Sequence, residues 1–361
     1  MSNVRVGIVG LSWIGADPAG PASAPELGTA VPYSHASAMD AIADIEVVAA
    51  CDLDPDRRRD FVERWSNRWP RIETYGDIDE MLTTQLDLVA LVTPDHLHGQ
   101  MLLRCLDAGV PMLFSEKPFT TDLAEADAVL DRIARTGATV SVNHTWRWRP
   151  DIAETVAIAR EGRYGPISQI IVEAGGPRAM LFRNLSHFVD LAIHLHDAAP
   201  VWVSGLLETG SRDYGTRYAG DGGRDPRLDP GALSLIGFSD GTTAFVSGLK
   251  SSVADVSINV AFRDARITID ALGARVVAVP RTGDGTPGGV SGPILQPLKP
   301  RATRSGMVAG LIDLIDSHRA GREPTCSAQS ARSTVAVLDA ILRSNAGDGA
   351  RVDLRRHTQR T

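Results

Sequence analysis

The sequence has 361 residues and a formal net charge of -7, with an isoelectric point near 5.7. A chain of this length exceeds what one hydrophobic core usually holds, which predicts two domains. The acidic balance excludes nucleic acid and anionic membrane as partners, because both bind through clustered Lys and Arg.

The cysteines and the amino-terminal residues indicate the compartment. Cys51, Cys105 and Cys326 are odd in number and share no CxxC spacing, which is typical of reduced thiols. The chain enters strand-like sequence by Val4 without a signal-type segment, and no later stretch is apolar for long enough to span a bilayer. We therefore predict a soluble, cytoplasmic protein without disulfides or a zinc knuckle.

The first part of the chain alternates buried-strand runs with helical patterns, which is typical of βαβ units on a parallel sheet. It predicts a Rossmann dinucleotide-binding domain over residues 1–145. The helices end at Gly109 and Gly137, residues suited to a helix carboxyl terminus. The expected strands cover 4–10, 45–51, 86–92, 111–116 and 138–143, and the helices cover 99–109 and 123–137.

The pattern changes after residue 146, where longer alternating segments predict antiparallel strands. Residues 146–361 are expected to form an α+β domain with a large, mainly antiparallel open sheet. Asp240-Gly241 predicts a hairpin turn. The strand segments are 167–174, 232–249 and 255–271, the helices 184–197, 303–319 and 328–344, and the long loops 209–230 and 282–300.

A phosphate-binding turn follows the first strand. Gly10, Ser12 and Gly15 stand at GxGxxG spacing, with Ser in place of the middle Gly, and Trp13 and Ile14 complete the turn. Asp52 follows the second strand, where a carboxylate can accept hydrogen bonds from an adenosine ribose. Since that charge repels a 2′-phosphate, NAD is favoured, with NADP as the alternative. The simpler interpretation is a tight turn, with Asp52 capping the next helix.

An insertion of residues 16–34 separates this turn from the helical sequence that resumes at His35. In folds of this kind the phosphate turn normally leads directly into a helix. The insertion is interpreted either as a flap over cofactor or substrate, or as a packing or oligomer contact. Its length alone does not decide between the two.

Several motifs together resemble a known family. SEKPFT (115–120) is similar to the EKP motif of the Gfo/Idh/MocA oxidoreductases, named after glucose-fructose oxidoreductase, inositol dehydrogenase and rhizopine catabolism. TPDHLH (93–98), RWRP (147–150), YGPISQI (164–170) and HFVDL (187–191) follow in the order found in that family. The resemblance places Thr93, Pro94, His98, Glu116 and Lys117 at the cofactor. His98 either lines the nicotinamide pocket or caps the following helix.

The resemblance implies an NAD(P)-dependent dehydrogenase or reductase that acts on CH-OH groups of a sugar, cyclitol or sugar derivative, with Lys117 and His187 at the reacting oxygen. His187 suits proton transfer because its reference pKa lies close to working pH. The Lys117 ammonium would stabilise negative charge developing on that oxygen. The alternatives are a surface cation paired with Glu116 and a histidine that packs a helix.

The sequence departs from the family four residues before His187, where members often have Asp and this chain has Arg183. Asn184 and Asp190 are the nearest polar substitutes. Arg183 would bind a carboxylate or phosphate of the substrate, or else it points to solvent. Trp146 and Arg147 are expected at the substrate, with domain packing as the alternative. His187, Asp190 and His194 share a helix face, but no metal is predicted, because the reaction needs none.

Similar proteins bury the open sheet face by oligomerising, which implies a homodimer or homotetramer. Two other functions stay open: an NAD-dependent glycosidase that oxidises its substrate transiently, and a non-catalytic sensor of dinucleotide or ligand. The sequence leaves the substrate, the carbon oxidised and the direction of reaction undecided.

Overall fold

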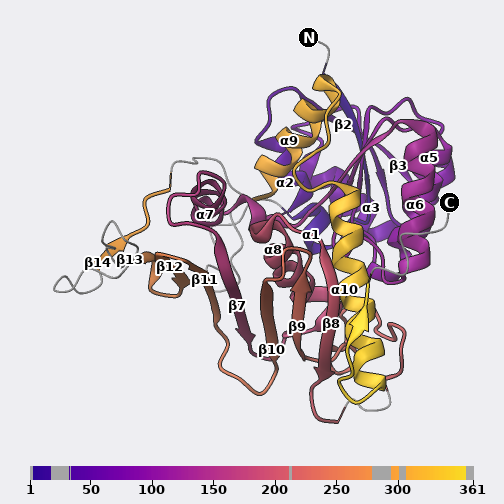
Figure 1. Cartoon of the computed structure of the whole chain (residues 1–361). Helices are drawn as coiled ribbons and strands as arrows, with labels where there is room; N and C mark the ends of the chain where they lie inside the picture. Colours follow the sequence, from indigo (N-terminus) through magenta and orange to yellow (C-terminus); the bar gives the residue numbers. More distant parts are fainter. Residues whose placement is uncertain are drawn as a thin grey trace, which may run out of the picture. The chain divides into compact units, whose positions relative to one another are not determined.

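The computed structural model describes residues 3–17, 32, 34–210, 214–278, 294–300 and 306–354. The chain divides into two compact units. The first consists of Met1–Trp148 with Arg304–Arg332, and the second of Arg149–Thr303 with Ser333–Thr361. Figure 1 labels their elements.

A six-stranded parallel sheet forms the centre of the first unit, in the order β3-β2-β1-β4-β5-β6. Its four central strands, β2, β1, β4 and β5, are almost entirely apolar and buried, because helices cover both faces of such a sheet. The strands are β1 (Val4–Val9), β2 (Ile45–Cys51), β3 (Glu73–Tyr75), β4 (Leu88–Leu91), β5 (Met112–Ser115) and β6 (Thr139–Val142).

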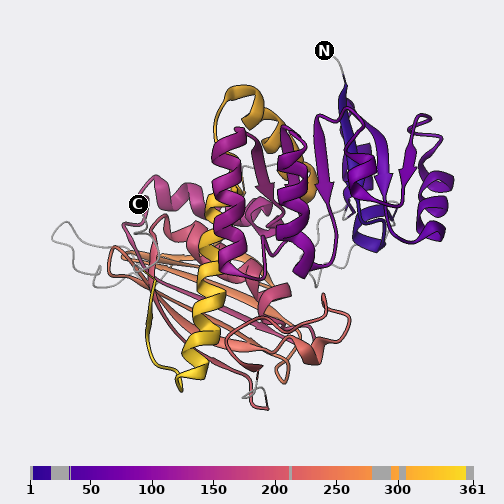
Figure 2. The same cartoon turned by 90° about the vertical axis from the view of Figure 1, so that its right-hand side faces the viewer.

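Helices pack on each face of this sheet. One face forms a core with α2, α3 and α9, in which Met39, Phe61 and Leu311 are buried. On the other face α5 and α6 lie side by side (Figure 2). The helices are α1 (Trp13–Ala16), α2 (His35–Asp40), α3 (Pro55–Trp65), α4 (Ile78–Met81), α5 (His98–Asp107), α6 (Leu123–Thr136) and α9 (Gly306–Ala320), with 3-10 turns η2 (Asp95–Leu97) and η3 (Thr145–Trp148).

The boundary predicted at residues 145 and 146 differs from the observed division. The first unit extends to Trp148 and also includes a later segment of the chain, Arg304–Arg332. The reason is α9, whose residues Met307, Leu311 and Leu314 are buried in the same core as Phe114 of β5. An amphipathic pattern predicts a helix but does not say which sheet the helix will cover.

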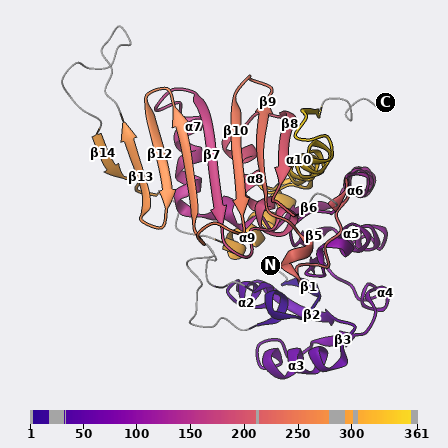
Figure 3. The same ribbon diagram turned by 90° about the horizontal axis from the view of Figure 1, so that it is seen from below.

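The second unit contains a nine-stranded sheet in the order β14-β13-β12-β11-β7-β10-β9-β8-β15, seen in Figure 3. Its pairs are antiparallel except for β10 with β7. Asp240-Gly241 forms the predicted turn, with Gly241 at φ +88°. The strands are β7 (Ile167–Gly175), β8 (Pro200–Leu207), β9 (Ala232–Phe238), β10 (Thr243–Leu249), β11 (Val256–Phe262), β12 (Ala265–Asp270), β13 (Gly273–Ala278), β14 (Ile294–Pro297) and β15 (Val352–Asp353).

One face of this sheet is covered and the other exposes leucines. Helix α8 packs on β7 and β10, and Ile341 of α10 lies close to Gly205 of β8. On the opposite face, Leu206, Leu233 and Leu235 are 36 to 42% exposed. The helices are α7 (Pro150–Arg160), the π-helical turn η4 (Leu181–Leu185), α8 (Ser186–His196), the 3-10 turn η6 (Pro226–Leu228) and α10 (Ala328–Ala346).

The predicted fold class, a Rossmann domain followed by an α+β domain with a mainly antiparallel sheet, is therefore confirmed. The predicted loop 282–300 is corrected in its last part, because β14 pairs with β13 there. Residues 282–293 of that loop lie outside the described part of the chain.

Candidate active site

The predicted nucleotide residues lie at one edge of the parallel sheet. Gly10 follows β1, Asp52 follows β2, Thr93 stands two residues after β4, and Glu116 follows β5. These four strands are neighbours in the order β2-β1-β4-β5 and run parallel, so their carboxyl ends meet at the same edge. Ligands of open α/β sheets bind at this edge.

The turn after β1 requires its glycines. Gly10 has φ +95°, and a Cβ there would lie 2.4 Å from the carbonyl oxygen of Val92. A Cβ on Gly15 would lie 2.1 Å from the carbonyl oxygen of Gly10. Ser12 is the N-cap of α1, Ile14 packs against the core and Trp13 is 56% exposed. The turn thus keeps the close backbone approach that a phosphate site needs.

Asp52 is joined to this turn. Its Oδ2 accepts a hydrogen bond of 2.8 Å from the backbone N–H of Leu11, and its Oδ1 accepts one of 2.9 Å from Asp54. The N-cap of α3 is Asp54, whose side chain accepts from Asp56, so the simpler interpretation of Asp52 as that cap is wrong. A carboxylate has about four acceptor sites, which leaves capacity for ribose hydroxyls.

Thr93 and His98 differ in whether their side-chain polar atoms have hydrogen-bond partners. Thr93 Oγ1 is buried and has no hydrogen-bond partner among the described residues. His98 is 1% exposed, with Nδ1 2.6 Å from the carbonyl oxygen of Pro118 and Nε2 2.9 Å from that of Thr93. Burial lowers the pKa of His98, although these carbonyls and Asp95 oppose the shift. The capping prediction for His98 is corrected, because both ring nitrogens connect two loops and the N-cap of α5 is Leu97. Its cofactor contact stays a prediction.

Lys117 is the one half-buried residue in the otherwise buried stretch Met112–Thr120. The carboxylate of Glu116 beside it accepts from His35 Nε2 at 3.0 Å, Asn143 Nδ2 at 2.6 Å and Lys117 N at 3.2 Å. Burial alone would raise the pKa of Glu116, but His35, the Lys117 charge and Asn143 outweigh it and hold that pKa well below its usual range. The carboxylate of Glu116 thus binds protein donors, and the cofactor contact of this residue stays a prediction.

The two ends of the insertion lie together. Ser34, the N-cap of α2, donates its hydroxyl to the carbonyl oxygen of Asp17. Arg64 of α3 pairs with Asp17 at 2.9 Å. The end of the phosphate turn and the start of α2 are therefore joined directly, in spite of the insertion between them. Residues 18–31 and 33 of the insertion lie outside the described part of the chain.

In the second unit, three predicted residues share an accessible face. Within Leu181–Ala192 only Arg183, Asn184 and His187 are not buried. Residues three and four apart lie on one side of a helix, so His187 faces the same side as the other two. Asn184 Oδ1 is buried and has no hydrogen-bond partner among the described residues.

Arg183 does not point to solvent. Its Nη1 donates to the carbonyl oxygen of Gly222, and its backbone N–H donates to Asp229 Oδ2 at 3.1 Å. Burial and the charge of Arg183 together lower the pKa of Arg178, which indicates that two guanidinium groups lie near one another. Such a pair favours an anion between them.

Trp146 and Arg147 are buried, at 7% and 4% exposure. Arg147 Nη1 donates to the carbonyl oxygen of Thr325 at 2.6 Å, and its Nη2 donates to Ser330 Oγ at 3.2 Å. The guanidinium thus fixes the chain before and within α10, and the indole is buried, as the domain-packing alternative expects. Their contact with substrate stays a prediction.

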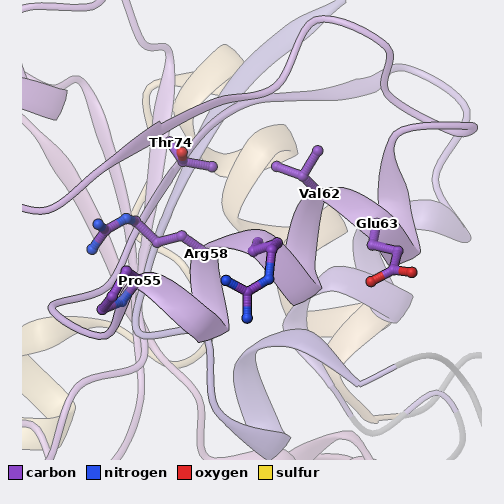
Figure 4. A pocket seen from close by; sticks show the side chains of 6 residues that line it. Pro55, Arg58, Val62, Glu63 and Thr74 are labelled. Carbon is purple, nitrogen blue, oxygen red and sulfur yellow. The ribbon is translucent and has the colours of Figure 1, made fainter.

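An open depression lies between α3 and β3 (Figure 4). It is lined by Pro55, Arg58, Arg59, Val62, Glu63 and Thr74, none of which the sequence predicts for the site. Arg58 there donates to the carbonyl oxygen of Asp52 at 2.6 Å, and Arg59 pairs with Asp56 at 2.8 Å. The depression therefore does not indicate a different active site.

Asp190 is 1% exposed and accepts from Thr334 Oγ1 at 3.3 Å, so it faces the interior. Among the described residues no group of three His, Cys, Asp or Glu is arranged to hold a metal ion. No helix of the described part is both long and apolar enough to cross a membrane.

Residues 4–144 match the model of the Gfo/Idh/MocA oxidoreductase family, described as an NAD-binding Rossmann fold. The amino-terminal domain of this chain is thus similar to the Rossmann domain of the Gfo/Idh/MocA family. The resemblance inferred from EKP and its companion motifs is confirmed. NAD binding, which the sequence predicts from Gly10 and Asp52, is a property of this family.

Several Gfo/Idh/MocA-like proteins are similar over different lengths. D-apiose dehydrogenase of Paraburkholderia graminis is 32% identical over 176 residues, spanning 46% of this chain and 45% of that protein. UDP-N-acetylglucosamine 3-dehydrogenase of Acidithiobacillus ferrooxidans is 24% identical over 268 residues, spanning 74% of this chain and 81% of that protein. The aldose-aldose oxidoreductase of Caulobacter crescentus has the same fold, with a TM-score of 0.75, 19% identity and coverage of 97% and 99%.

The sequence does not predict two residues of this candidate site, His35 and Asn143. Both donate to Glu116, and both are buried, at 0% and 2% exposure. His35 lies 81 positions from Glu116, so no local spacing indicates the contact. The one available signal is that a polar residue stands in a stretch that otherwise reads as buried.

Proposed function

We propose that the protein is an NAD(P)-dependent oxidoreductase that interconverts a hydroxyl and a keto carbon of a sugar, cyclitol or sugar derivative. The observation that carries the proposal is Lys117, the accessible cation of a buried turn at the sheet edge that also holds Gly10 and Asp52. The family match of residues 4–144 supports the cofactor class. Sugar dehydrogenases among the relatives support the substrate class.

The residues at the sheet edge fit a dinucleotide. Gly10 and Gly15 leave space where a Cβ would collide with backbone, and helix-turn amides suit a pyrophosphate. The unpartnered Thr93 Oγ1 is a buried polar atom that a ligand would satisfy. The charge of Asp52 favours NAD, and NADP is the alternative cofactor. When bound, the nicotinamide supplies the hydride acceptor or donor.

Lys117 is proposed to bind the reacting oxygen. The chain contains 37 Lys and Arg residues, of which only Lys117, Lys250 and Lys299 are lysine. A sequence that uses arginine for most of its cations has lysine here, and a lysine pKa can be shifted into the working range whereas that of arginine cannot. The Lys117 ammonium would stabilise charge on the oxygen and share its proton.

His187 is proposed to exchange the hydroxyl proton. It lies on the accessible face of η4 and α8, beside Arg183 and Asn184, and imidazole titrates near working pH. Asn184, with its Oδ1 unpartnered among the described residues, is proposed as a substrate contact.

Arg183 is proposed to select an anionic substrate. The guanidinium of Arg178 lies near it, and arginines recognise carboxylates and phosphates in bidentate fashion. A sugar acid, a phosphosugar or a nucleotide sugar would meet this requirement. The name of the UDP-N-acetylglucosamine relative is in line with the last of these classes.

A homodimer or homotetramer is proposed from the uncovered sheet face. Leu206 pairs with Leu233, and Leu235 pairs with Ser204, so the three leucines stand on one side of the sheet. An apolar face of this kind is typically buried by a partner. Light scattering after size-exclusion chromatography would measure the mass directly.

A titration of the purified protein with NADH and NADPH, followed by nicotinamide fluorescence, tests the cofactor. The absorbance of the reduced cofactor with sugars, cyclitols and sugar acids then tests the reaction. Saturable NADH binding with turnover is expected. Tightly retained NAD without net turnover would support the glycosidase instead, and binding without any chemistry would support the sensor.

A further inference from the structure

The Glu116 carboxylate is held by donors from three separate elements. His35 Nε2 comes from α2, Asn143 Nδ2 follows β6, and the Lys117 backbone N–H follows β5, at 3.0, 2.6 and 3.2 Å. The residue is 8% exposed. A buried carboxylate is costly unless charges and hydrogen bonds satisfy it, so the position of this side chain depends on these donors.

His35 contacts both the strand and the carboxylate at its end. The residue is 0% exposed, and its ring lies 5.4 Å from the ring of Phe114, at an interplanar angle of 59°. Phe114 stands in β5, two residues before Glu116. His35 is also the first residue of α2, directly after Ser34, which joins the ends of the insertion. Its imidazole is therefore fixed by packing as well as by its hydrogen bond.

Glu116 in turn is bonded to the backbone of Lys117. Its Oε2 accepts from the Lys117 backbone N–H, and its backbone N–H donates to the carbonyl oxygen of Leu91 at 2.8 Å. The charge of Lys117 contributes to the low pKa of Glu116, and by reciprocity the carboxylate stabilises the ammonium. What neutralises the carboxylate thus also affects the acidity of Lys117.

We propose that His35 is a positioning residue for Lys117 and acts through Glu116. This inference rests on the proposed function, in which Lys117 meets the reacting oxygen. His35 holds the carboxylate in the geometry that orients the Lys117 turn, and it offsets part of the negative charge beside the ammonium. Of the other titratable groups in the described part of the chain, His98, joined to Pro118, interacts electrostatically with Glu116, and Asp95 interacts with His98.

The chain offers a clean test, because it contains only three lysines. Reductive methylation with ¹³C-formaldehyde labels Lys117, Lys250, Lys299 and the amino terminus, and NMR then gives a separate titration curve for each. Lys117→Arg assigns the Lys117 signal by its loss. The readout reports on Lys117 itself and needs no substrate.

The variants are His35→Phe, Glu116→Gln and the two combined. In His35→Phe the pKa of Lys117 is expected to rise by about 0.5 unit, because the carboxylate relies more on the ammonium. In Glu116→Gln it is expected to fall, because the neighbouring anion is gone. In the combined variant it should equal that of Glu116→Gln alone, which is the signature of an effect transmitted through Glu116. Lys250 and Lys299 should stay unchanged throughout.

Two further variants separate positioning from folding. His35→Gln keeps an N–H donor toward Glu116 and is expected to return the pKa of Lys117 toward the wild-type value. His318→Phe removes a histidine of the same unit that bonds Thr139 at 2.9 Å, and is expected to leave Lys117 unchanged. If His35→Phe does not fold, His35→Gln carries the test alone. A Lys117 pKa in His35→Gln that differs from the wild-type value would then contradict the proposal.

An unchanged Lys117 pKa in His35→Phe overturns the inference, as does an equal shift in the Glu116→Gln background. Where a substrate is found, His35→Phe should lower kcat at least tenfold while the NADH Kd changes less than about threefold. If no substrate is turned over, the proposed function fails while the NMR titration still tests the coupling.

Discussion

The carboxylate of Asp52 and the backbone N–H of Leu11 are joined by a 2.8 Å hydrogen bond. The bond connects the end of β2 to the phosphate turn after β1, so one residue both shapes the turn and sets its charge. Arg57 approaches the same Oδ2 at 3.7 Å from a half-exposed position. Cofactor choice is therefore expected to depend on Asp52.

Asp52→Asn should weaken NADH binding about tenfold, because hydrogen bonds to a charged group contribute about 1.5–3 kcal/mol. NADPH binding should change less or improve, since the carboxylate no longer repels the 2′-phosphate. Fluorescence titrations with both nucleotides measure the ratio. Equal losses for NADH and NADPH would mean that Asp52 only supports the turn.

Gly10→Ala should abolish nucleotide binding and destabilise the protein. The new Cβ would lie 2.4 Å from the Val92 carbonyl oxygen, at φ +95°. Gly109→Ala is the matched control, because Gly109 also has a positive φ, +78°, but its Cβ meets nothing within 4 Å. Both variants should lose about 1–2 kcal/mol from the left-handed backbone, and Gly10→Ala more. Similar unfolding temperatures and NADH affinities in the two would refute the close approach.

Glu116→Gln should lower the free energy of unfolding at neutral pH by about 3 kcal/mol, as is typical of breaking a buried charge pair. The folded-state pKa of Glu116 lies below its ordinary value, so its contribution is present above the ordinary carboxyl pKa, about 4.3, and is lost as pH falls below it. Urea unfolding at pH 7 and pH 4 should show the difference from wild type shrinking at the lower pH. A difference that grows on acidification would contradict this account.

Arg183→Gln should raise KM for acidic substrates at least tenfold, because a bidentate arginine contact is lost, and should affect neutral sugars little. Arg217→Gln removes the same charge from an exposed position of the loop between β8 and β9, and serves as its control. Steady-state kinetics on matched acidic and neutral sugars give the comparison. Equal effects on both substrate types would leave Arg183 with its structural bond to Gly222 only.

The strands that could be predicted from sequence are the buried ones. β2 coincides with the predicted range 45–51 because its short, mainly apolar run with adjacent valines is typical of a buried strand. β3 was missed, since Glu73–Tyr75 is short and largely exposed. Similarly, β14 is exposed and sits at the sheet edge, so no hydrophobic pattern marks it.

The site residues show a similar distinction between those that local sequence marks and those that depend on distant contacts. Gly10 and Asp52 could be predicted because the chemistry follows directly after a strand. The roles of Arg147 and His98 could not, because they depend on backbone carbonyls distant in sequence or in a neighbouring loop. His35 carries no motif of its own, and its function follows only from the three-dimensional contact with Glu116.

The central proposal is that Lys117 and His187 carry out proton transfer at the reacting oxygen. The most direct test measures turnover of Lys117→Arg and His187→Asn on the best substrate of the panel, with NADH affinity determined on the same preparations. Both variants should lose roughly 10²–10⁴-fold in kcat, the range of general acid–base catalysis, while NADH affinity stays nearly unchanged. Turnover near the wild-type rate in either variant would contradict the role assigned to that residue.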